Sequence, residues 1–160
     1  MLSSFHKINA WLRWTMFLPV LCLLLLPFPA AADQPAPKEG ILALNAALLD
    51  AMKRADQLGY AGRYALLEPV VRDTFDLAFM GMKATGKYWE GLSKEQRAQY
   101  LTTYTEWSIA NYAGNFNGYS GEKFELVSES TPEQGIVTVV SKLIQQNDVP
   151  YTFQYLLRSV

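Results

Sequence analysis

The fold is decided by one stretch, residues 93–128, with the sequence SKEQRAQYLTTYTEWSIANYAGNFNGYSGEKFELVS. Ser93 and Gln96 have the spacing of a capping box, in which each side chain accepts a hydrogen bond from the backbone of the other residue. A helix is therefore predicted from this point to about Phe116. Beyond it, the spacing of the apolar residues changes from helical to alternating, beginning with Phe124. The chain passes here from a helical half to a β half.

Three helical stretches are predicted before this one. From residue 41 onward, apolar side chains recur at helical spacing until Gly59. Residues 60–74 continue the pattern, but Pro69 predicts a kink or a break just before it. Asp76 is placed to cap a short helix over residues 77–85, which Gly86 would end.

Three strands are predicted after the helices, over residues 123–128, 137–143 and 151–157, with turns at 131–135 and 145–148. Strands joined by short turns form an antiparallel meander, and helices followed by strands are typical of an α+β domain. We therefore expect the helices to pack on one face of the meander. The last strand is rich in Tyr, Phe and Leu, so its outer edge is expected to be open unless a further segment or a partner covers it.

The N-terminus resembles an export signal. Residues 1–32 combine an early cationic part, an apolar run that includes Leu23–Leu26, and the small residues Ala30–Ala32 before Asp33. We predict a cleavable signal peptide over 1–32, a flexible leader over 33–40 and a single domain over 41–160. A retained membrane anchor is the alternative. A lipid-modified Cys22 is disfavoured, because a small residue must precede such a cysteine and Leu21 is large.

Composition excludes several classes of function. The formal net charge is −1, so no basic excess favours nucleic-acid binding. The single His and the single Cys both lie within the predicted signal peptide, which excludes Cys- or His-based nucleophiles and zinc sites from the mature chain. No sequence motif of a metal or cofactor site occurs. A small α+β enzyme that uses a buried carboxylate, with Asp73, Asp76 or Glu90 as candidates, stays as an alternative.

Aromatic residues and methionines are concentrated before and within the helix predicted at 94–116. They indicate either a packed core, as in an interaction module that binds no ligand, or an adaptable apolar pocket. The inner face of this helix is predicted to carry Leu101, Tyr104, Trp107 or Ser108, Asn111 and Tyr112, with Tyr100 beside it.

Three segments resemble the MlaC family of periplasmic auxiliary components of phospholipid-transporting ABC systems, also labelled toluene-tolerance proteins. They are GRYALLEPVVRDTFDLAFM (residues 62–80), GKYW (86–89) and LSKEQRAQYLTTYTEWSIANYAGNFNGYSGEKF (92–124). The run at 115–124 is most similar to the hopanoid-biosynthesis-associated HpnM subgroup. Family members continue with a Gly-Trp-containing strand and a C-terminal helix, which this sequence lacks, so the resemblance implies that the C-terminal part of the domain is missing.

The resemblance implies a periplasmic carrier whose helices and sheet enclose an apolar cavity for the acyl chains of a phospholipid or hopanoid-type lipid. It also implies partners, namely an outer-membrane lipoprotein–porin complex and an inner-membrane MCE-domain–ABC transporter complex. By analogy, eight residues are expected to line or close the cavity: Phe75, Met80, Trp89, Tyr104, Trp107, Val139, Phe153 and Tyr155.

Overall fold

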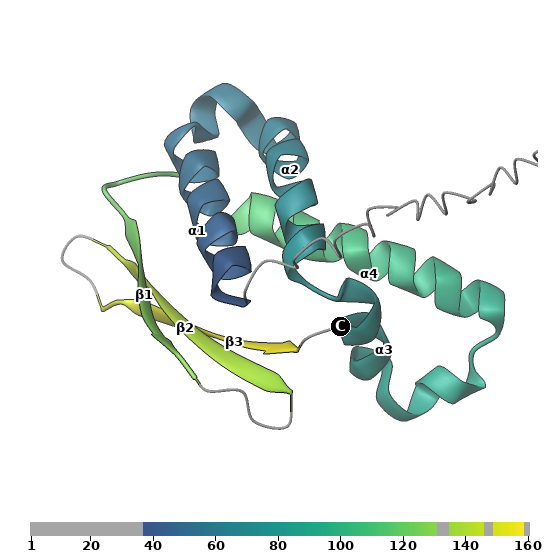
Figure 1. The fold of residues 1–160 in the computed structure, drawn as a ribbon. Helices are drawn as coiled ribbons and strands as arrows, with labels where there is room; N and C mark the ends of the chain where they lie inside the picture. The colour runs from purple at the N-terminus through teal and green to yellow at the C-terminus, as the bar shows by residue number, and fades with distance from the viewer. Residues whose placement is uncertain (1–36, 131–134, 146–148, 159–160) are drawn as a thin grey trace, which may run out of the picture. The chain divides into compact units, whose positions relative to one another are not determined.

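Four α-helices precede three β-strands in the computed structural model (Figure 1), which describes residues 37–130, 135–145 and 149–158. The α-helices are α1 (Pro37–Lys53), α2 (Ala55–Thr74), α3 (Leu77–Thr85) and α4 (Lys94–Asn115), and a 3-10 helix, η1 (Gly86–Gly91), joins α3 to α4. The strands are β1 (Lys123–Glu129), β2 (Ile136–Ile144) and β3 (Tyr151–Arg158). The predicted α+β class is confirmed. The predicted signal peptide, residues 1–32, lies outside the described residues.

The predicted helix caps are present. The Ser93 amide donates to Gln96 Oε1 at 2.8 Å, and the Gln96 amide donates to Ser93 Oγ at 3.2 Å, which completes the capping box of α4. The Asp76 carboxylate accepts a hydrogen bond from the Phe79 amide at 2.9 Å and caps α3. Each cap satisfies an amide that has no partner within its own helix, and so fixes where the helix begins.

Two helices differ from their predicted extents. Helix α1 begins at Pro37, within the predicted leader, because proline at a first helical position loses no intrahelical hydrogen bond. Helix α2 continues through Pro69 to Thr74, so the proline does not break the helix. Leu67 and Val71 of the same helix are completely buried, and their packing offsets the backbone hydrogen bond that the proline cannot make. The interruption lies instead at Gly59, whose φ of 59° and ψ of −172° are non-helical.

The sheet is an antiparallel meander in the order β1–β2–β3, with a register shift in β1 between Leu126 and Ser128. Helices α1 and α2 lie over one face of this sheet (Figure 1), and α1 contacts β1 and β2. Buried and half-buried residues alternate along β2. The alternation of residues predicted for this strand therefore reflects that one face of the sheet is covered by helices.

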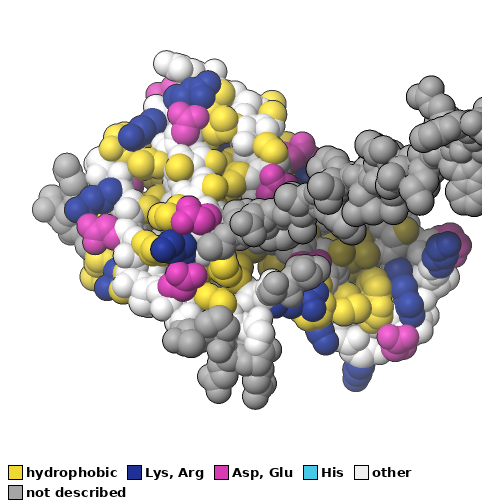
Figure 2. Space-filling model, viewed as in Figure 1, with side chains coloured by type: hydrophobic (Ala, Val, Ile, Leu, Met, Phe, Trp, Pro, Cys, Tyr) yellow, Lys and Arg dark blue, Asp and Glu magenta, His cyan; other side chains and the backbone are white. Residues whose placement is uncertain are grey.

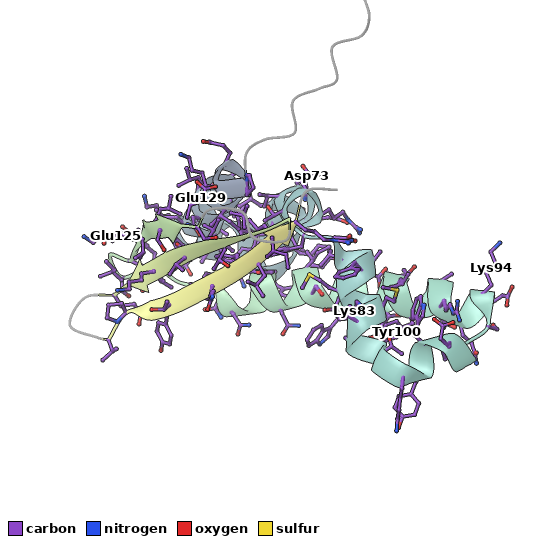
Figure 3. All side chains as sticks on the ribbon, turned by 60° about the horizontal axis from the view of Figure 1, so that its bottom comes forward. Asp73, Lys83, Lys94, Tyr100, Glu125 and Glu129 are labelled. Atoms are coloured by element: carbon purple, nitrogen blue, oxygen red, sulfur yellow. The ribbon has the colours of Figure 1, made fainter. Side chains whose placement is uncertain are left out.

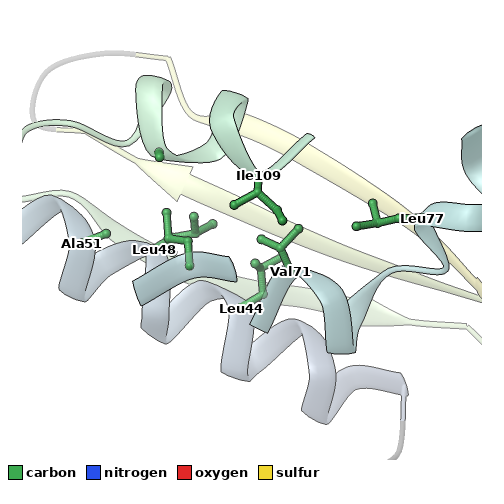
Figure 4. Packing of buried hydrophobic residues seen from close by; sticks show 8 residues of the cluster. Leu44, Leu48, Ala51, Val71, Leu77 and Ile109 are labelled. Carbon is green, nitrogen blue, oxygen red and sulfur yellow. The ribbon is translucent and has the colours of Figure 1, made fainter. Parts of the chain in front are cut away.

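The core consists of two clusters of buried apolar side chains. The larger cluster joins all four α-helices and consists of Leu44, Leu48, Ala51, Leu67, Val71, Leu77, Ile109 and Ala113 (Figure 4). The smaller cluster joins α1 to β2 and consists of Ile41, Val137 and Val139. The completely buried residues of α4 are Ile109 and Ala113, which the predicted inner face did not include, whereas Tyr104 and Tyr112 of that face are partly buried against the core.

Two buried polar side chains connect elements that are distant in sequence. Asn45 Nδ2 on α1 donates to Ser141 Oγ on β2 at 2.9 Å, and within the described part of the chain Asn45 Oδ1 has no hydrogen-bond partner. The guanidinium of Arg63 on α2 donates to the carbonyl of Ala113 at 3.0 Å and to that of Ala55 at 3.1 Å. Ala113 lies in the last turn of α4, where carbonyls lack helical partners, so Arg63 acts as a C-terminal cap across helices.

Helix α3, η1 and the first turns of α4 extend beyond the end of the sheet (Figures 1 and 3), where Figure 3 labels Lys83, Lys94 and Tyr100. The close contact between α3 and α4 depends on Gly81. A Cβ atom at this position would lie 2.9 Å from Leu101 Cδ2 and 3.1 Å from Tyr104 Cδ1. This approach positions α3 against the aromatic face of α4.

Candidate functional site

The candidate site is an apolar pocket of about 180 Å³ between the α2–α3 junction and α4. Its lining comes from the C-cap of α2, from α3 and from three consecutive turns of α4: Phe75, Leu77, Met80, Tyr104, Trp107, Ser108, Asn111 and Tyr112. Phe75 is the C-cap of α2 and has an extended backbone conformation, and Asp76 caps α3 directly after it. The Phe75 ring lies against that of Tyr112, with the two centroids 5.9 Å apart.

Two polar side chains of the pocket, those of Ser108 and Asn111, bond to their own helix. Ser108 Oγ donates to the Tyr104 carbonyl at 2.7 Å, and Asn111 Nδ2 donates to the Trp107 carbonyl at 2.8 Å. Both donors are thus satisfied by α4 itself. The pocket therefore presents a mainly hydrocarbon and aromatic surface, which suits an apolar ligand.

Six aromatic rings form a closed circuit next to this pocket, and we refer to them as the aromatic belt. Neighbouring centroids in the circuit are separated by 5.9 Å (Phe75–Tyr112), 6.0 Å (Tyr112–Phe116), 6.3 Å (Phe116–Phe124), 6.4 Å (Phe124–Phe153), 6.3 Å (Phe153–Tyr155) and 6.2 Å (Tyr155–Phe75). These separations are within the range of favourable aromatic contacts. The belt joins the end of α2, α4, β1 and β3, and it shares Phe75 and Tyr112 with the pocket.

The phenols of the belt lie in apolar surroundings. Burial raises the pKa of Tyr112 to about 12. Burial also raises the pKa of Tyr155, and the nearby charge of an ionised Tyr112 raises it further. Both phenols are therefore neutral at physiological pH.

The mouth of the pocket is apolar with cations beside it. The side chains of Met80 and Trp107 are 40% and 61% exposed, and Figure 2 shows hydrophobic side chains exposed over the α3–α4 part of this face. The residue next to Met80, Phe79, lies under the guanidinium of Arg158, 3.9 Å from its ring centroid, and near Lys83 Nζ at 5.3 Å. Arg158 also forms an ion pair with Asp76 at 2.7 Å, which ties the end of β3 to the start of α3.

Of the eight residues expected to line a cavity, four line the pocket: Phe75, Met80, Tyr104 and Trp107. Phe153 and Tyr155 belong to the aromatic belt. The other two lie elsewhere. Trp89 is in η1 beneath the guanidinium of Arg97, at 5.1 Å, and Val139 is completely buried in the smaller core cluster. A role of these residues in ligand binding stays a prediction.

Four residues of the pocket were absent from the expected lining: Leu77, Ser108, Asn111 and Tyr112. Leu77 is the first residue of a helix too short for its buried face to be identified from periodicity. Tyr112 follows Tyr104 by eight residues and Ser108 by four, which places all three on one face of α4. That spacing was the available signal for Tyr112.

The three candidate carboxylates are not buried. Asp73 is exposed, and Asp76 serves as the cap of α3. The Glu90 side chain is 86% exposed and lies 3.4 Å from Arg97. None of the three therefore provides the desolvated acid that the enzyme alternative requires. The buried carboxylate is that of Glu122, which accepts a hydrogen bond from the Ser120 amide.

A second recess, of about 330 Å³, is lined by Arg72, Leu101, Thr102 and Thr105. Its two threonines and arginine make it a poorer site for a hydrocarbon. Within residues 37–130, 135–145 and 149–158, no helix has both the length and the apolarity to cross a membrane. The same residues contain no group of three or more His, Cys, Asp or Glu side chains that could hold a metal ion.

The chain matches the protein family described as MlaC protein over residues 43–160, which is most of its length. This range contains all the residues of the pocket and of the aromatic belt. No curated protein and no solved structure matches the chain.

Proposed function

Because the chain belongs to the MlaC family, we propose that it is a periplasmic lipid carrier that holds the hydrocarbon part of a lipid in the pocket and against the aromatic belt. One observation carries this proposal: the pocket is lined mainly by apolar and aromatic side chains, and it shares Phe75 and Tyr112 with the six half-buried rings of the aromatic belt. Such a surface binds hydrocarbon and requires no catalytic group.

The energetics of lipid transfer explain why a carrier is needed. Exposing a buried CH₂ group to water costs about 0.8 kcal/mol, so two acyl chains of roughly 16 carbons would cost on the order of 20–25 kcal/mol. An apolar sheath removes most of this cost during passage through an aqueous compartment. No nucleophile, metal or cofactor takes part.

The pocket is small for a whole lipid. Its volume of about 180 Å³ is below the roughly 300–1,000 Å³ of typical small-ligand sites. We therefore propose that the pocket holds part of an acyl chain and that the rest lies along the aromatic belt and the inner face of β3. The exposed Met80 and Trp107 would contact the chain where it leaves the pocket, and the nearby Arg158 and Lys83 would lie close to an anionic head group.

The finer assignments also belong to this proposal. They are a cleavable signal peptide over 1–32, a single carrier domain over 41–160, and a ligand that is a phospholipid or, by likeness to the HpnM subgroup, a hopanoid-type lipid. The proposed partners are an outer-membrane lipoprotein–porin complex and an inner-membrane MCE-domain–ABC transporter complex. The apolar pocket favours this reading over an interaction module that binds no ligand.

Lipid extraction tests the proposal. Ser108 is half-buried, lines the pocket and bonds only to its own helix among the described residues, so Ser108→Phe should fill the pocket without removing a contact between elements. Mass spectrometry of organic extracts from the purified full chain should detect bound lipid in the wild type and much less in Ser108→Phe.

Thr103→Phe is the matched control, because Thr103 is exposed on the same helix. It should retain wild-type amounts of lipid. A folded wild-type chain that carries no phospholipid or hopanoid would refute the carrier. The enzyme alternative is tested by replacing Asp73, Asp76 and Glu90 with Asn or Gln, which a carrier should tolerate without loss of lipid.

A further inference from the structure

The phenol hydroxyls of Tyr112 and Tyr155 stand out among the polar groups of the site. Tyr112 lines the pocket from α4, and Tyr155 lies on β3. Both rings contact Phe75, with centroids 5.9 Å and 6.2 Å from it. The two hydroxyls therefore belong to one aromatic surface although their residues are far apart in the sequence.

Neither hydroxyl has a hydrogen-bond partner within the described residues. Tyrosines in largely apolar surroundings usually place this hydroxyl against a hydrogen-bond partner. The sole side-chain nitrogen or oxygen in this part of the chain that is both sealed from solvent and unbonded is Asn45 Oδ1. The two phenol oxygens are consequently unbonded but still reachable from open space.

The surroundings of these hydroxyls are apolar. Burial raises the pKa of both phenols, so both keep their proton at neutral pH and can donate it in a hydrogen bond. Ser108 and Asn111 already donate to carbonyls of α4. Tyr112 and Tyr155 thus provide hydrogen-bond donors that no described residue accepts.

Building on the proposed function, we propose that Tyr112 and Tyr155 donate hydrogen bonds to an ester carbonyl of the bound lipid, and that the site thereby selects ester-linked acyl lipids over ether-linked or purely hydrocarbon ones. An ester carbonyl is a neutral acceptor at the boundary between acyl chain and head group. It can enter an apolar recess at low cost, whereas a phosphate would be costly to desolvate there. A site with unpaired polar groups rejects ligands that leave them unpaired.

The test compares two lipids on the full chain: phosphatidylcholine with two palmitoyl chains, and its analogue in which both ester linkages are ethers. Affinity is measured by displacement of a fluorescent fatty acid. The wild type should bind the diester more tightly. Tyr112→Phe and Tyr155→Phe should each weaken diester binding by about 2–10-fold, as expected for loss of one hydrogen bond, and leave diether binding unchanged.

Tyr100→Phe is the control, because Tyr100 is on α4 but does not line the pocket. A second measurement uses the wild type alone: the tyrosine absorption should shift on addition of the diester but not of the diether. Equal binding of both lipids by the wild type and both variants would overturn this inference and leave the carrier intact. If the Phe variants lost affinity for both lipids equally, the tyrosines would contribute only packing, and this result would also overturn the inference. If the wild type bound neither lipid, the proposed function itself would fail.

Discussion

Burial of the Tyr112 ring has a consequence for stability at alkaline pH. The pKa of this phenol is raised to about 12 in the folded chain, whereas an unfolded tyrosine titrates near 10. The folded state therefore holds a proton that the unfolded state releases between these values. By linkage, the stabilisation is complete below about pH 10 and is lost as the pH rises towards 12.

We predict that urea unfolding of the wild type at a series of pH values will show a decline in stability between about pH 10 and 12. Tyr112→Phe should flatten part of this decline, and Tyr155→Phe should act in the same direction. A decline of the same slope in the wild type and in both variants would contradict the assignment of these buried phenols.

Ionisation of Asp76 affects stability at acidic rather than alkaline pH, because its pKa is lowered in the folded chain. A hydrogen bond from the Phe79 amide and then one from Arg158 lower the pKa of this carboxyl below its ordinary value. Its stabilising contribution is thus present above the unfolded pKa near 4 and is lost as the pH falls through the lower folded value. Asn at this position can still cap α3 but cannot form the ion pair.

We predict that Asp76→Ala destabilises the fold by about 1 kcal/mol, the usual cost of losing an N-cap, and that Asp76→Asn costs less. The exposed ion pair with Arg158 contributes little at neutral pH. Both variants should lose less stability than the wild type on acidification below about pH 4. Equilibrium unfolding at pH 7 and at pH 3 provides the comparison, and parallel losses in all three proteins would speak against this role of Asp76.

At the scale of elements, local signals predicted boundaries well. The capping box at Ser93, the cap at Asp76, the stop at Gly86 and the alternation in β2 and β3 are confirmed, whereas β1 shows no such alternation of burial. Each depends on neighbouring residues alone, so the sequence contains the information. The fold class follows from the order of these elements.

Features that depend on three-dimensional packing were predicted less well. Periodicity could not show that the buried residues of α4 are Ile109 and Ala113, because Trp107 is larger and more apolar yet 61% exposed at the mouth of the pocket. Val139, which was expected to line the cavity, lies in a buried cluster with Ile41 of α1, a contact between distant residues that no local pattern specifies. The aromatic belt depends on contacts between α4, β1 and β3, which no local pattern specifies.

Gly59 gives an element-scale prediction. Its φ of 59° and ψ of −172° lie in a region that is accessible essentially to glycine alone. Gly59→Ala should therefore destabilise the fold by roughly 1–3 kcal/mol, although a Cβ atom there would meet no other atom within 4 Å. The free energy of unfolding in urea measures the effect.

Gly40 is the matched control. It lies within α1, and a Cβ atom there would also meet nothing within 4 Å. Gly40→Ala should stabilise the fold by about 0.5–1 kcal/mol, because alanine loses less conformational freedom in a helix. Equal effects of the two substitutions would mean that backbone conformation does not decide the cost at Gly59.

At the scale of the whole molecule, the feature that matters is the edge of the sheet formed by β3. Strand β2 pairs on both of its edges, whereas β3 pairs with β2 alone among the described strands. Leu156 of β3 is 69% exposed and Tyr151 is 56% exposed. An edge strand with exposed apolar side chains favours the addition of a strand from another molecule.

We predict that the chain self-associates through β3 in a concentration-dependent manner. Leu156→Lys should reduce this association, because a lysine on an edge strand disfavours further pairing. Leu42→Lys, at an exposed position of α1, is the control and should not reduce it. Size-exclusion chromatography over a range of concentrations measures the effect, and a wild type that elutes as a monomer throughout would contradict the prediction.

The buried bond between Asn45 and Ser141 determines how α1 is aligned along the sheet. Apolar contacts are non-directional, so a helix that packs on an apolar sheet face could shift along it by one turn, about 5.4 Å, and still bury a similar apolar surface area. A slide of that size would leave both the amide and the hydroxyl unpaired, at a cost of about 1–3 kcal/mol. One alignment is then favoured over its neighbours by roughly 5- to 150-fold. The hydrogen bond between Asn45 and Ser141 thereby favours one position of α1 along β2 over the neighbouring positions.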